Sequence, residues 1–373
     1  MLYALSPATD PGANRAMRRR MALIVLIVLL ALTACKDRSP VIVTRFTAFG
    51  TQVDVSLVGV GKEQAKQAAD RIEQDFVYLE RDWHAWEPGP MTRANRLLAS
   101  SEPFVAPPSM LPLVRLGKAL EVRSDGLFNP AIGHLMDLWG FHDDQLGSRP
   151  PPSPERIARL VKANPTMAQI DIEGLELRGH NPSLRLDFNA IAKSHAIDLS
   201  IRHLMEAGID NALIQAGGHL RAIGDRAGQP WRIPIRRPNG SGVFAILPIR
   251  GNESVATIAD YDRNFLFEGT LYHDVIDPRT GSPAQETRAV TVIHEDATTA
   301  AAAATALLIA GPTDWHRIAV NMGVRYVLLM DRQGRTHLNP GMAERLERVD
   351  DQDEIVLSEP LEIAAESSKT ELK

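Results

Sequence analysis

Cysteine is almost absent from this sequence: Cys35 is the only one among 373 residues. An internal disulfide is therefore excluded, and the folded part must be stabilised by burial of apolar side chains. An excess of charge is also lacking, since 41 lysines and arginines face 46 aspartates and glutamates, for a net charge of −5. This balance gives no electrostatic reason to expect binding to nucleic acid or to an anionic membrane. A hydrophobic fraction of 44% and a charged fraction of 23% are typical of a soluble globular protein with one large domain or two ordinary ones.

The short motifs of the common active sites are missing as well. The sequence has no Gly-x-Gly-x-x-Gly after a predicted strand, no Walker loop, no cysteine or histidine pair with zinc spacing and no Gly-x-Ser-x-Gly segment. A function must therefore be inferred from loops that combine unusual residues.

Long apolar runs are scarce, and the most pronounced one lies near the N-terminus. Arg18, Arg19 and Arg20 precede the 14 residues MALIVLIVLLALTA, which end at Cys35. A basic segment followed by an apolar run too short to span a bilayer is typical of a signal peptide. Small residues before a lone cysteine resemble a lipoprotein signal peptidase site, with Cys35 as the acylated residue; the alternative is an uncleaved anchor helix. We expect a membrane-anchored lipoprotein that faces the periplasm.

Strands and helices are both predicted along the rest of the chain. Residues 47–60 alternate apolar and polar side chains around a bend at Gly50, which predicts strands. Residues 62–80 and 190–208 have helical spacing, and the alanine-rich run 296–311 predicts a helix that ends at Gly311-Pro312. Strands mixed with a few long helices and short turns indicate an α+β fold. The chain divides into a signal peptide (1–35), a tether (36–44), one domain (45–349) and an acidic tail (350–373).

The segment HDVIDPRTG, residues 273–281, is the first candidate site. A strand that ends in histidine, aspartate and arginine offers a base, a carboxylate and a partner for phosphate. The same residues are also compatible with a tight turn in which Asp277 caps the backbone.

The segment LDFNAIAKSHAID, residues 186–198, is the second candidate site. Asp187 precedes a predicted helix and can cap its free N–H groups. Lys193 and His195 lie in the first two turns, where a cation opposes the helix dipole but suits a bound phosphate.

Two further features leave both a structural and a functional interpretation open. Gly217 and Gly218 permit either the close approach of a ligand or a β-bulge. Trp83 and Trp86 lie in a proline-rich loop, as packed hydrophobic residues or as a platform for a planar ligand such as a flavin.

Taken in order, these segments resemble the FAD:protein FMN transferase family, once described as thiamine-biosynthesis lipoproteins. The resemblance covers almost all of residues 45–330 and rests on AFGTQVDVSL, DWHAWEPGPMTRAN, GLFNPAIGHLMDLWGF, LDFNAIAKSHAID, ALIQAGGHLRAIG with PWRIPI, VATIADY, HDVIDPRTG and ATALLIAGP. It implies a flavin transferase fold with mixed, largely antiparallel sheets flanked by helices.

The resemblance also implies an activity. Such enzymes bind FAD and Mg²⁺, transfer FMN to a threonine hydroxyl of a partner protein and release AMP. The partners are typically membrane subunits of electron-transport complexes. The reaction needs charge neutralisation at the pyrophosphate and a base for the incoming hydroxyl.

By similarity, the site residues fall into four sets. The catalytic candidates are Asp274, His273 and Lys193. The expected FAD-binding residues are Trp86, Leu127, Phe128, Asn129, Asp187, Lys193, Val275, Asp277 and Arg279. The expected metal positions are the carbonyl of Ala190, position 301, which holds alanine (Ala301), and the hydroxyl of Thr305; Cys35 is the lipidation site.

The sequence departs from the family pattern inside these motifs. Ala301 stands where a metal-binding aspartate is usual, four residues before Thr305. Asp274 replaces the usual histidine, and His273 lies one position earlier, which on a strand points its ring to the opposite face.

Other departures are Ile258 and Ala259 for Ser-Gly, Ser194 and His195 for Gly-Tyr, and His219 for an acid. Because Mg²⁺ prefers carboxylate oxygens, the loss at position 301 predicts weaker metal binding unless Asp274 or Asp296 supplies a ligand. Asp274 is preferred, since Asp296 is expected to cap the helix.

Three hypotheses follow. The chain transfers FMN to a partner protein, with altered metal dependence. Alternatively, it is a binding module that holds the flavin without transferring it. A third possibility is a different nucleotide-dependent activity on the same scaffold.

Overall fold

The computed structural model describes residues 40–363, apart from 144–145 and 239–241. The predicted signal peptide at residues 1–35, its lipidation residue Cys35 and residues 364–373 of the predicted tail lie outside the described residues. Within the described part, no helix combines the length and apolar character needed to cross a membrane.

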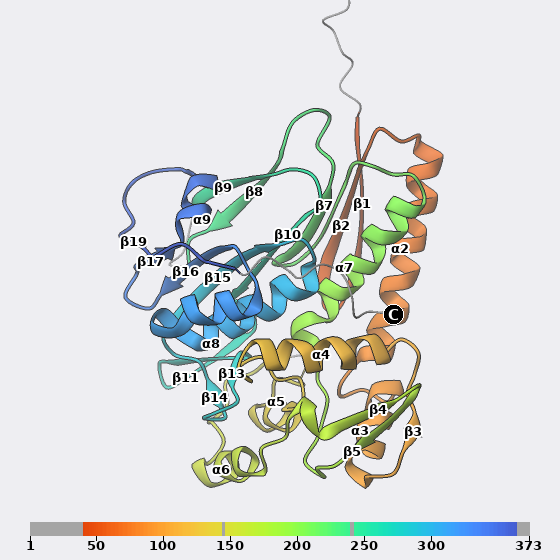
Figure 1. Cartoon of the computed structure of the whole chain (residues 1–373), viewed down its shortest axis with the longest axis vertical. Coiled ribbons are helices and arrows are strands. Elements are labelled where there is room, and N and C mark those ends of the chain that lie inside the picture. The colour runs from red at the N-terminus through yellow and green to blue at the C-terminus, as the bar shows by residue number, and fades with distance from the viewer. Residues whose placement is uncertain (1–39, 144–145, 239–241, 364–373) are drawn as a thin grey trace, which may run out of the picture. The chain divides into compact units, whose positions relative to one another are not determined.

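A nine-stranded sheet forms the centre of the folded domain (Figure 1). Neighbouring strands run antiparallel except for the last pair, which is parallel. This confirms the prediction of an α+β fold with largely antiparallel sheets. In spatial order the strands are β1 (Val41–Ala48), β2 (Thr51–Val58), β6 (Ala212–Ala216), β7 (His219–Ile223), β10 (Glu253–Ala259), β15 (Thr287–His294), β16 (Tyr326–Asp331), β17 (Thr336–Leu338) and β19 (Ile355–Leu357).

The first hairpin of this sheet forms as its alternating sequence predicts. β1 and β2 pair along their whole length, and the two turn residues Phe49 and Gly50 both have positive φ, 51° and 65°. Such a turn matches the twist of the strands that it joins. β1 begins at Val41, four residues before the predicted start of the domain, because its first residues complete the pairing with the end of β2.

Both faces of the sheet are covered. In β6, Ile214 belongs to a large core and its neighbour Leu213 to a second core, because successive side chains of a strand point to opposite faces. Three long helices contribute to the large core: α2 (Lys62–Trp83), α7 (Asn189–Glu206) and α8 (Ala297–Met322). The second core is closed by β8 (Trp231–Arg236), β9 (Val243–Ile249), β18 (Glu347–Arg348) and α9 (Pro340–Arg345).

A layer of shorter elements extends the large core on the side where α4 contacts α8 (Figure 1). Its helices are α3 (Pro90–Ser100), α4 (Leu111–Arg123), α5 (Gly133–Trp139), α6 (Pro154–Ala163) and the 3-10 helix η1 (Met167–Gln169). A three-stranded sheet, β3 (Phe104–Val105), β5 (Glu176–Gly179) and β4 (Ile170–Glu173), and the hairpins β11 (Asn264–Phe267) with β12 (Thr270–His273) and β13 (Ile276–Asp277) with β14 (Ser282–Pro283) complete it.

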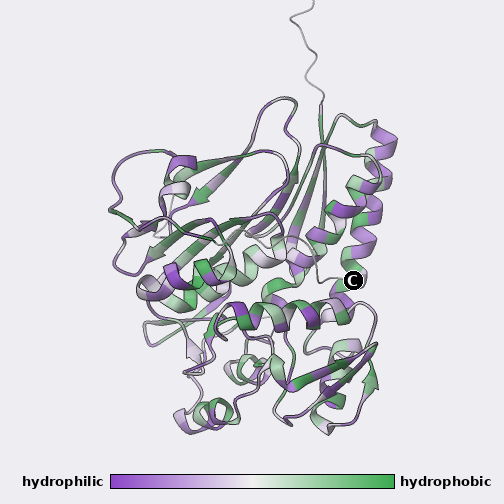
Figure 2. Cartoon of the chain, viewed as in Figure 1, coloured by the Kyte–Doolittle hydropathy of each residue, from purple (hydrophilic) through white to green (hydrophobic). Residues whose placement is uncertain are grey.

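Helix α8 contains the alanine-rich run. Gly311 has non-helical angles (φ 70°, ψ −179°) directly before Pro312, so the predicted helix end is a real break. The chain then resumes a helix to Met322, which the sequence pattern did not predict. The alanines from 300 to 304 are fully buried, and Figure 2 shows this half of α8 in the pale and green tones of apolar residues. Close packing against the sheet explains why this stretch is so poor in large and polar side chains.

The predicted acidic tail is partly structured. Residues 355–357 form β19, whose backbone pairs in parallel with β17 at the edge of the sheet. Three short strands, β17, β18 and β19, therefore follow β16.

Candidate functional site

A cavity of about 860 Å³ opens on the side of the large core. This volume suits a cofactor-sized ligand. Its walls come from segments far apart in the sequence: the turn after β1, the loop after α2, residues 127–132, the start of α7, the turn between β6 and β7, the end of β10 with the residues after it, residues 274–276 and one face of α8.

Most of the predicted ligand-binding residues line this cavity. They are Trp86, Leu127, Phe128, Asn129, Asp187, Ala190, Lys193, Asp274, Val275 and Thr305. Backbone pairing joins two of these segments, because the N–H of Asp187 donates to the carbonyl of Pro130 at 2.8 Å. The structure thus brings together segments that the sequence predicted only separately.

His273, which was predicted as a catalytic candidate, is not among the residues that line the cavity. Its side chain is fully buried, and Nε2 donates to the carbonyl oxygen of Ala284 at 2.6 Å. The N–H of Val275 donates to the other ring nitrogen at 3.3 Å. Burial lowers the pKa of His273, which keeps the ring neutral in this position. β12 ends at His273, and Asp274 lies in the bend that follows it, where it lines the cavity.

Asp277 and Arg279 stabilise a turn and do not line the cavity. The Asp277 carboxylate accepts the backbone N–H of Arg279 at 2.9 Å and its Nε and Nη2 at 3.0 and 2.8 Å. Gly281 N–H closes the turn on the carbonyl of Asp277 at 2.7 Å. The tight-turn interpretation therefore holds: in the structure the two side chains stabilise the segment that follows Asp274 and Val275.

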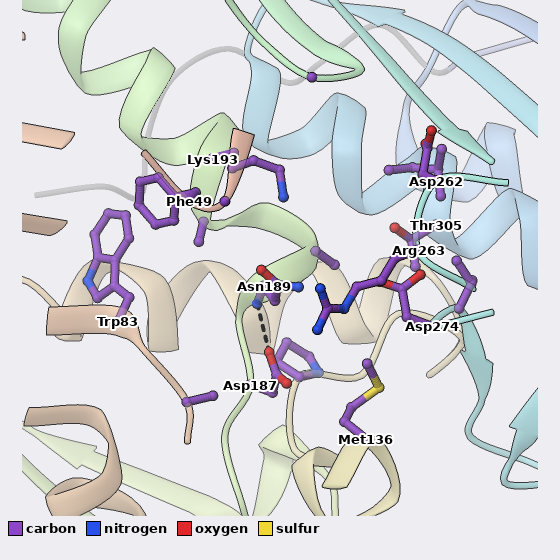
Figure 3. A pocket seen from close by; sticks show the side chains of 18 of the residues that line it. Phe49, Trp83, Met136, Asp187, Asn189, Lys193, Asp262, Arg263, Asp274 and Thr305 are labelled. Carbon is purple, nitrogen blue, oxygen red and sulfur yellow. Dashed lines mark hydrogen bonds between the residues drawn. The ribbon is translucent and has the colours of Figure 1, made fainter. Parts of the chain in front are cut away.

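Asp187 is anchored at the start of α7 (Figure 3). Its Oδ1 accepts the N–H of Asn189 at 2.8 Å, and its Oδ2 accepts Nε2–H of His142 at 2.8 Å. Burial acts to raise the pKa of Asp187, but the hydrogen bond and charge of His142, the Asn189 N–H and Arg185 outweigh it, so the pKa is lowered. The predicted cap is confirmed, and the group stays ionised.

Two cations and two carboxylates surround the centre of the cavity: Lys193, Arg263, Asp262 and Asp274 (Figure 3). Burial lowers the pKa of Lys193, although Asp274 and Asp262 oppose this. Burial raises the pKa of Asp274 to about 6, against the opposing charges of Lys193 and Arg263. A carboxyl group with this pKa can accept a proton near neutral pH.

Arg263 and Asp262 were missed by the sequence analysis. Both directly follow the motif VATIADY, residues 255–261, which could have drawn attention to them. Nη2 of Arg263 donates to the carbonyls of Phe141 and Asp143 at 2.9 and 2.7 Å, which fixes the guanidinium. Its buried Nε finds no acceptor among the described residues. The side chain can therefore offer a donor and a positive charge to an anionic ligand.

The predicted metal positions provide no charged ligand. Ala301 is fully buried, and the hydroxyl of Thr305 donates to its carbonyl at 2.9 Å. In the part of the chain that the structure describes, no three histidine, cysteine, aspartate or glutamate side chains form a group that could hold a metal ion. Asp296 caps α8 by accepting the N–H of Thr299 at 2.7 Å, as expected. The set of Ala190, Ala301 and Thr305 therefore does not by itself fit a tightly bound Mg²⁺.

The paired glycines form the two-residue turn between β6 and β7, whose register shows no β-bulge. Gly217 and Gly218 line the cavity, but a Cβ on Gly218 would lie 2.4 Å from the carbonyl oxygen of Thr257. The close backbone contact between β7 and β10 therefore requires glycine at position 218.

His219 also lines the cavity, and its Nδ1 lies 2.7 Å from the hydroxyl of Ser194. Burial, together with the charge of Lys193, lowers the pKa of His219 to about 3, so the ring is neutral. Ser194 and His219, both departures from the family pattern, therefore form a hydrogen bond with each other.

Comparison with known proteins adds independent observations. The model of the ApbE family matches residues 49–328. A Rhodobacter capsulatus protein named FAD:protein FMN transferase is 37% identical over 346 residues, which cover 91% of this chain and 65% of that protein. A Vibrio cholerae protein of the same name is 29% identical over 297 residues, with 78% of this chain and 87% of that protein covered.

The fold is also similar to solved structures. The crystal structure of an ApbE protein from Thermotoga maritima superposes with a TM-score of 0.75 at 27% sequence identity. The superposition covers 83% of this chain and 100% of that chain.

Proposed function

We propose, since this chain belongs to the ApbE family, that it is an FAD:protein FMN transferase acting on a threonine hydroxyl of a partner protein. The observation that carries the proposal is the cavity itself. It places an aromatic wall at Trp86, an anchored carboxylate at Asp187, cations at Lys193 and Arg263, and a carboxyl group of raised pKa at Asp274 around one space.

The reaction is a phosphoryl transfer. The threonine oxygen forms a bond to the phosphorus on the FMN side of the pyrophosphate, and the bond from that phosphorus to the bridging oxygen breaks. AMP leaves with the bonding electron pair, and the threonine proton passes to a base. The product is an FMN phosphoester on the partner protein.

We assign a separate role in this reaction to each cavity residue. Asp274 accepts the proton of the incoming hydroxyl, because burial keeps its pKa near neutral pH. Lys193 and Arg263 offset the negative charge of the pyrophosphate. Trp86 borders the flavin, and Asp187 binds FAD from the start of α7.

Mg²⁺ enters this proposal as a weakly held ion. The carbonyl of Ala190 and the hydroxyl of Thr305 would be its protein ligands, and the ion would supply positive charge near the pyrophosphate. Ala301 offers no carboxylate to hold the ion. In this proposal Lys193 and Arg263 therefore provide most of the positive charge that faces the pyrophosphate in the cavity.

The test uses the purified full chain with FAD, Mg²⁺ and an acceptor protein that carries a target threonine. We expect covalent flavin fluorescence on the acceptor and release of an equal amount of AMP. Stoichiometric FAD binding without AMP would instead support the flavin-binding module. No flavin binding at all would leave only a different nucleotide-dependent activity.

The location is proposed as well: a lipid on Cys35 holds the domain at the membrane, facing the periplasm, where membrane electron-transport subunits are the acceptors. Support comes from Arg18–Arg20, the short apolar run and the lone cysteine after it. Cys35→Ser is expected to abolish lipid labelling and to move the protein from the membrane fraction to the soluble fraction. Retention of the variant in the membrane would favour an uncleaved anchor helix.

A further inference from the structure

His142 is a buried histidine that lies between two walls of the cavity without lining it. It follows α5 and the left-handed Gly140, which turns the chain at the end of the helix. Its side chain is 5% exposed. Neither the sequence motifs nor the proposed chemistry gives it a role.

Two cavity-lining side chains meet on this one imidazole. Nε2 lies 2.8 Å from Oδ2 of Asp187, and the ring stacks on the indole of Trp86 with centroids 4.8 Å apart and planes inclined by 16°. Trp86 and Asp187 belong to segments about one hundred residues apart, and each lines the cavity. His142 therefore connects an aromatic wall of the cavity to its anchored carboxylate.

The other ring nitrogen of His142, Nδ1, also has polar neighbours. Nδ1 lies 3.4 Å from Nη2 of Arg185 and 3.5 Å from Oδ1 of Asp137. Arg185 and Asp137 pair with each other at 3.1 Å. Since Nε2 points to a carboxylate that can only accept, Nε2 carries a proton, and the ring is fixed in orientation by groups on both of its edges.

Trp86 is confined by this arrangement. His142 covers one face of the indole, and the ring of His84 meets it at 4.3 Å with an angle of 64°. A planar ligand must therefore use the remaining exposed surface of Trp86. Because the side chain is already ordered, less rotamer freedom is lost when the ligand binds.

We propose that His142 is a positioning residue that holds Trp86 and Asp187 in register, so that the cavity is preformed for the flavin nucleotide. This inference rests on the proposed function, because it assumes that the ligand is FAD. His142 acts through its two neighbours and does not touch the ligand itself.

Three variants separate its two contacts. His142→Gln keeps a donor for Asp187 but removes the ring, His142→Phe keeps a ring for Trp86 but removes the donor, and His142→Ala removes both. His180→Gln is the matched control, because it breaks another histidine–aspartate pair, 2.6 Å to Asp171, on the exposed surface away from the cavity.

The primary measurement is the dissociation constant of FAD, taken without acceptor from quenching of flavin fluorescence. We expect His142→Ala to weaken FAD binding on the order of tenfold or more, as for loss of a hydrogen bond to a charged group. His142→Gln and His142→Phe should each show a smaller loss, and His180→Gln should match the unaltered chain. With saturating FAD, kcat should change less than the dissociation constant.

A second measurement reports on Trp86 directly. The tryptophan emission assigned to position 86, obtained by subtracting that of Trp86→Phe, is expected to increase and shift when His142 no longer stacks on it. A role confined to folding stability would lower the unfolding midpoint without changing this emission. If His142→Ala does not fold, His142→Gln and His142→Phe are compared instead. The FAD dissociation constant and the Trp86 emission of these two variants then test the positioning role.

These experiments distinguish failure of the His142 inference from failure of the proposed transferase function. An unaltered chain that transfers FMN, combined with folded His142 variants that bind FAD within about twofold of it, would overturn the inference alone. An unaltered chain that binds FAD but transfers nothing would overturn the transferase and leave the inference standing. Absence of FAD binding by the unaltered chain overturns both.

Discussion

Asp274 shows how one side chain acquires its chemistry from its surroundings. The carboxyl group stands where the resemblance described above implies a histidine, and burial raises its pKa to about 6 against the charges of Lys193 and Arg263. That value lies in the range of an ordinary histidine. The substitution can therefore preserve a base that works near neutral pH.

The first prediction concerns the pH dependence of this base. Only the carboxylate can accept a proton, so kcat/KM should be high above pH 6 and fall as the pH drops through about 6, the pKa of Asp274. Asp274→Asn should lower kcat by about 10²–10⁴-fold. Asp262→Asn should move the midpoint to lower pH, because the charge of Asp262 raises the pKa of Asp274. An unchanged profile in Asp274→Asn would assign the base elsewhere.

The second prediction concerns Ala301. Ala301→Asp places a carboxylate one helical turn before Thr305, at a fully buried position. Half-maximal activity should then need less Mg²⁺ than in the unaltered chain. Without metal the buried charge should lower the melting temperature, and Mg²⁺ should restore it. The unaltered chain, melted with and without Mg²⁺, is the control, and an identical Mg²⁺ requirement in both proteins would refute this account.

At the scale of elements, α8 has two caps at its N-terminus. Asp296 accepts Thr299 N–H from its own segment, whereas Asp198 of α7 accepts the N–H groups of Ala297 and Thr298 at 2.8 and 2.9 Å. Asp198 also binds Nη1 of Arg221 at 2.6 Å. This carboxylate therefore links α7, α8 and β7.

The third prediction compares the two caps by urea denaturation. Asp198→Ala should lower the free energy of unfolding by about 3–5 kcal/mol, because Arg221 and two buried N–H groups lose their partner. Asp296→Ala should cost only about 1 kcal/mol, the usual value of a cap. Equal losses would contradict the interpretation of Asp198 as a buried link.

The Asp296 cap should also respond to acid. Burial opposes ionisation of Asp296, but His294 and Thr299 outweigh it and lower its pKa to about 2. A group whose pKa is lower in the folded state stabilises above its unfolded pKa. Its contribution is therefore lost as the pH falls through about 2, and the difference between Asp296→Ala and the unaltered chain should vanish there.

At the scale of the whole molecule, one sheet joins two cores. The large core carries the cavity, and the second core lies on the other face of the same strands. Cavity walls come from segments between Phe49 and Ile309, so the site spans nearly the whole domain. Binding of a ligand should therefore stabilise the domain as one unit.

The fourth prediction tests this coupling by calorimetry. The described domain should unfold in a single transition, and FAD at 100 times its dissociation constant should stabilise it by about 2.7 kcal/mol. AMP and riboflavin at the same concentration serve as partial ligands and should each give a smaller shift. Two separate transitions, only one of them moved by FAD, would show that the second core unfolds independently.

Much of the fold was determined by local sequence. The alternation around Gly50, the spacing in α2 and α7 and the Gly311-Pro312 break all depend on residues within one or two turns of each other. In the site, the predicted cap at the start of α7 is equally local, because Asp187 accepts the N–H of Asn189 two residues later. Local backbone geometry fixes such features, and a single sequence displays them.

What only the tertiary structure decided are the contacts between distant segments. The stacking of Trp86 on His142, the bond of Asp198 to the start of α8 and the anchoring of Arg263 by carbonyls of residues 141 and 143 join positions that no local pattern relates. The sequence supplied the chemical groups of the site, and packing determined which of them meet. The physical reason is that periodicity fixes the direction of a side chain relative to its own backbone, whereas its partner depends on how the chain returns to it.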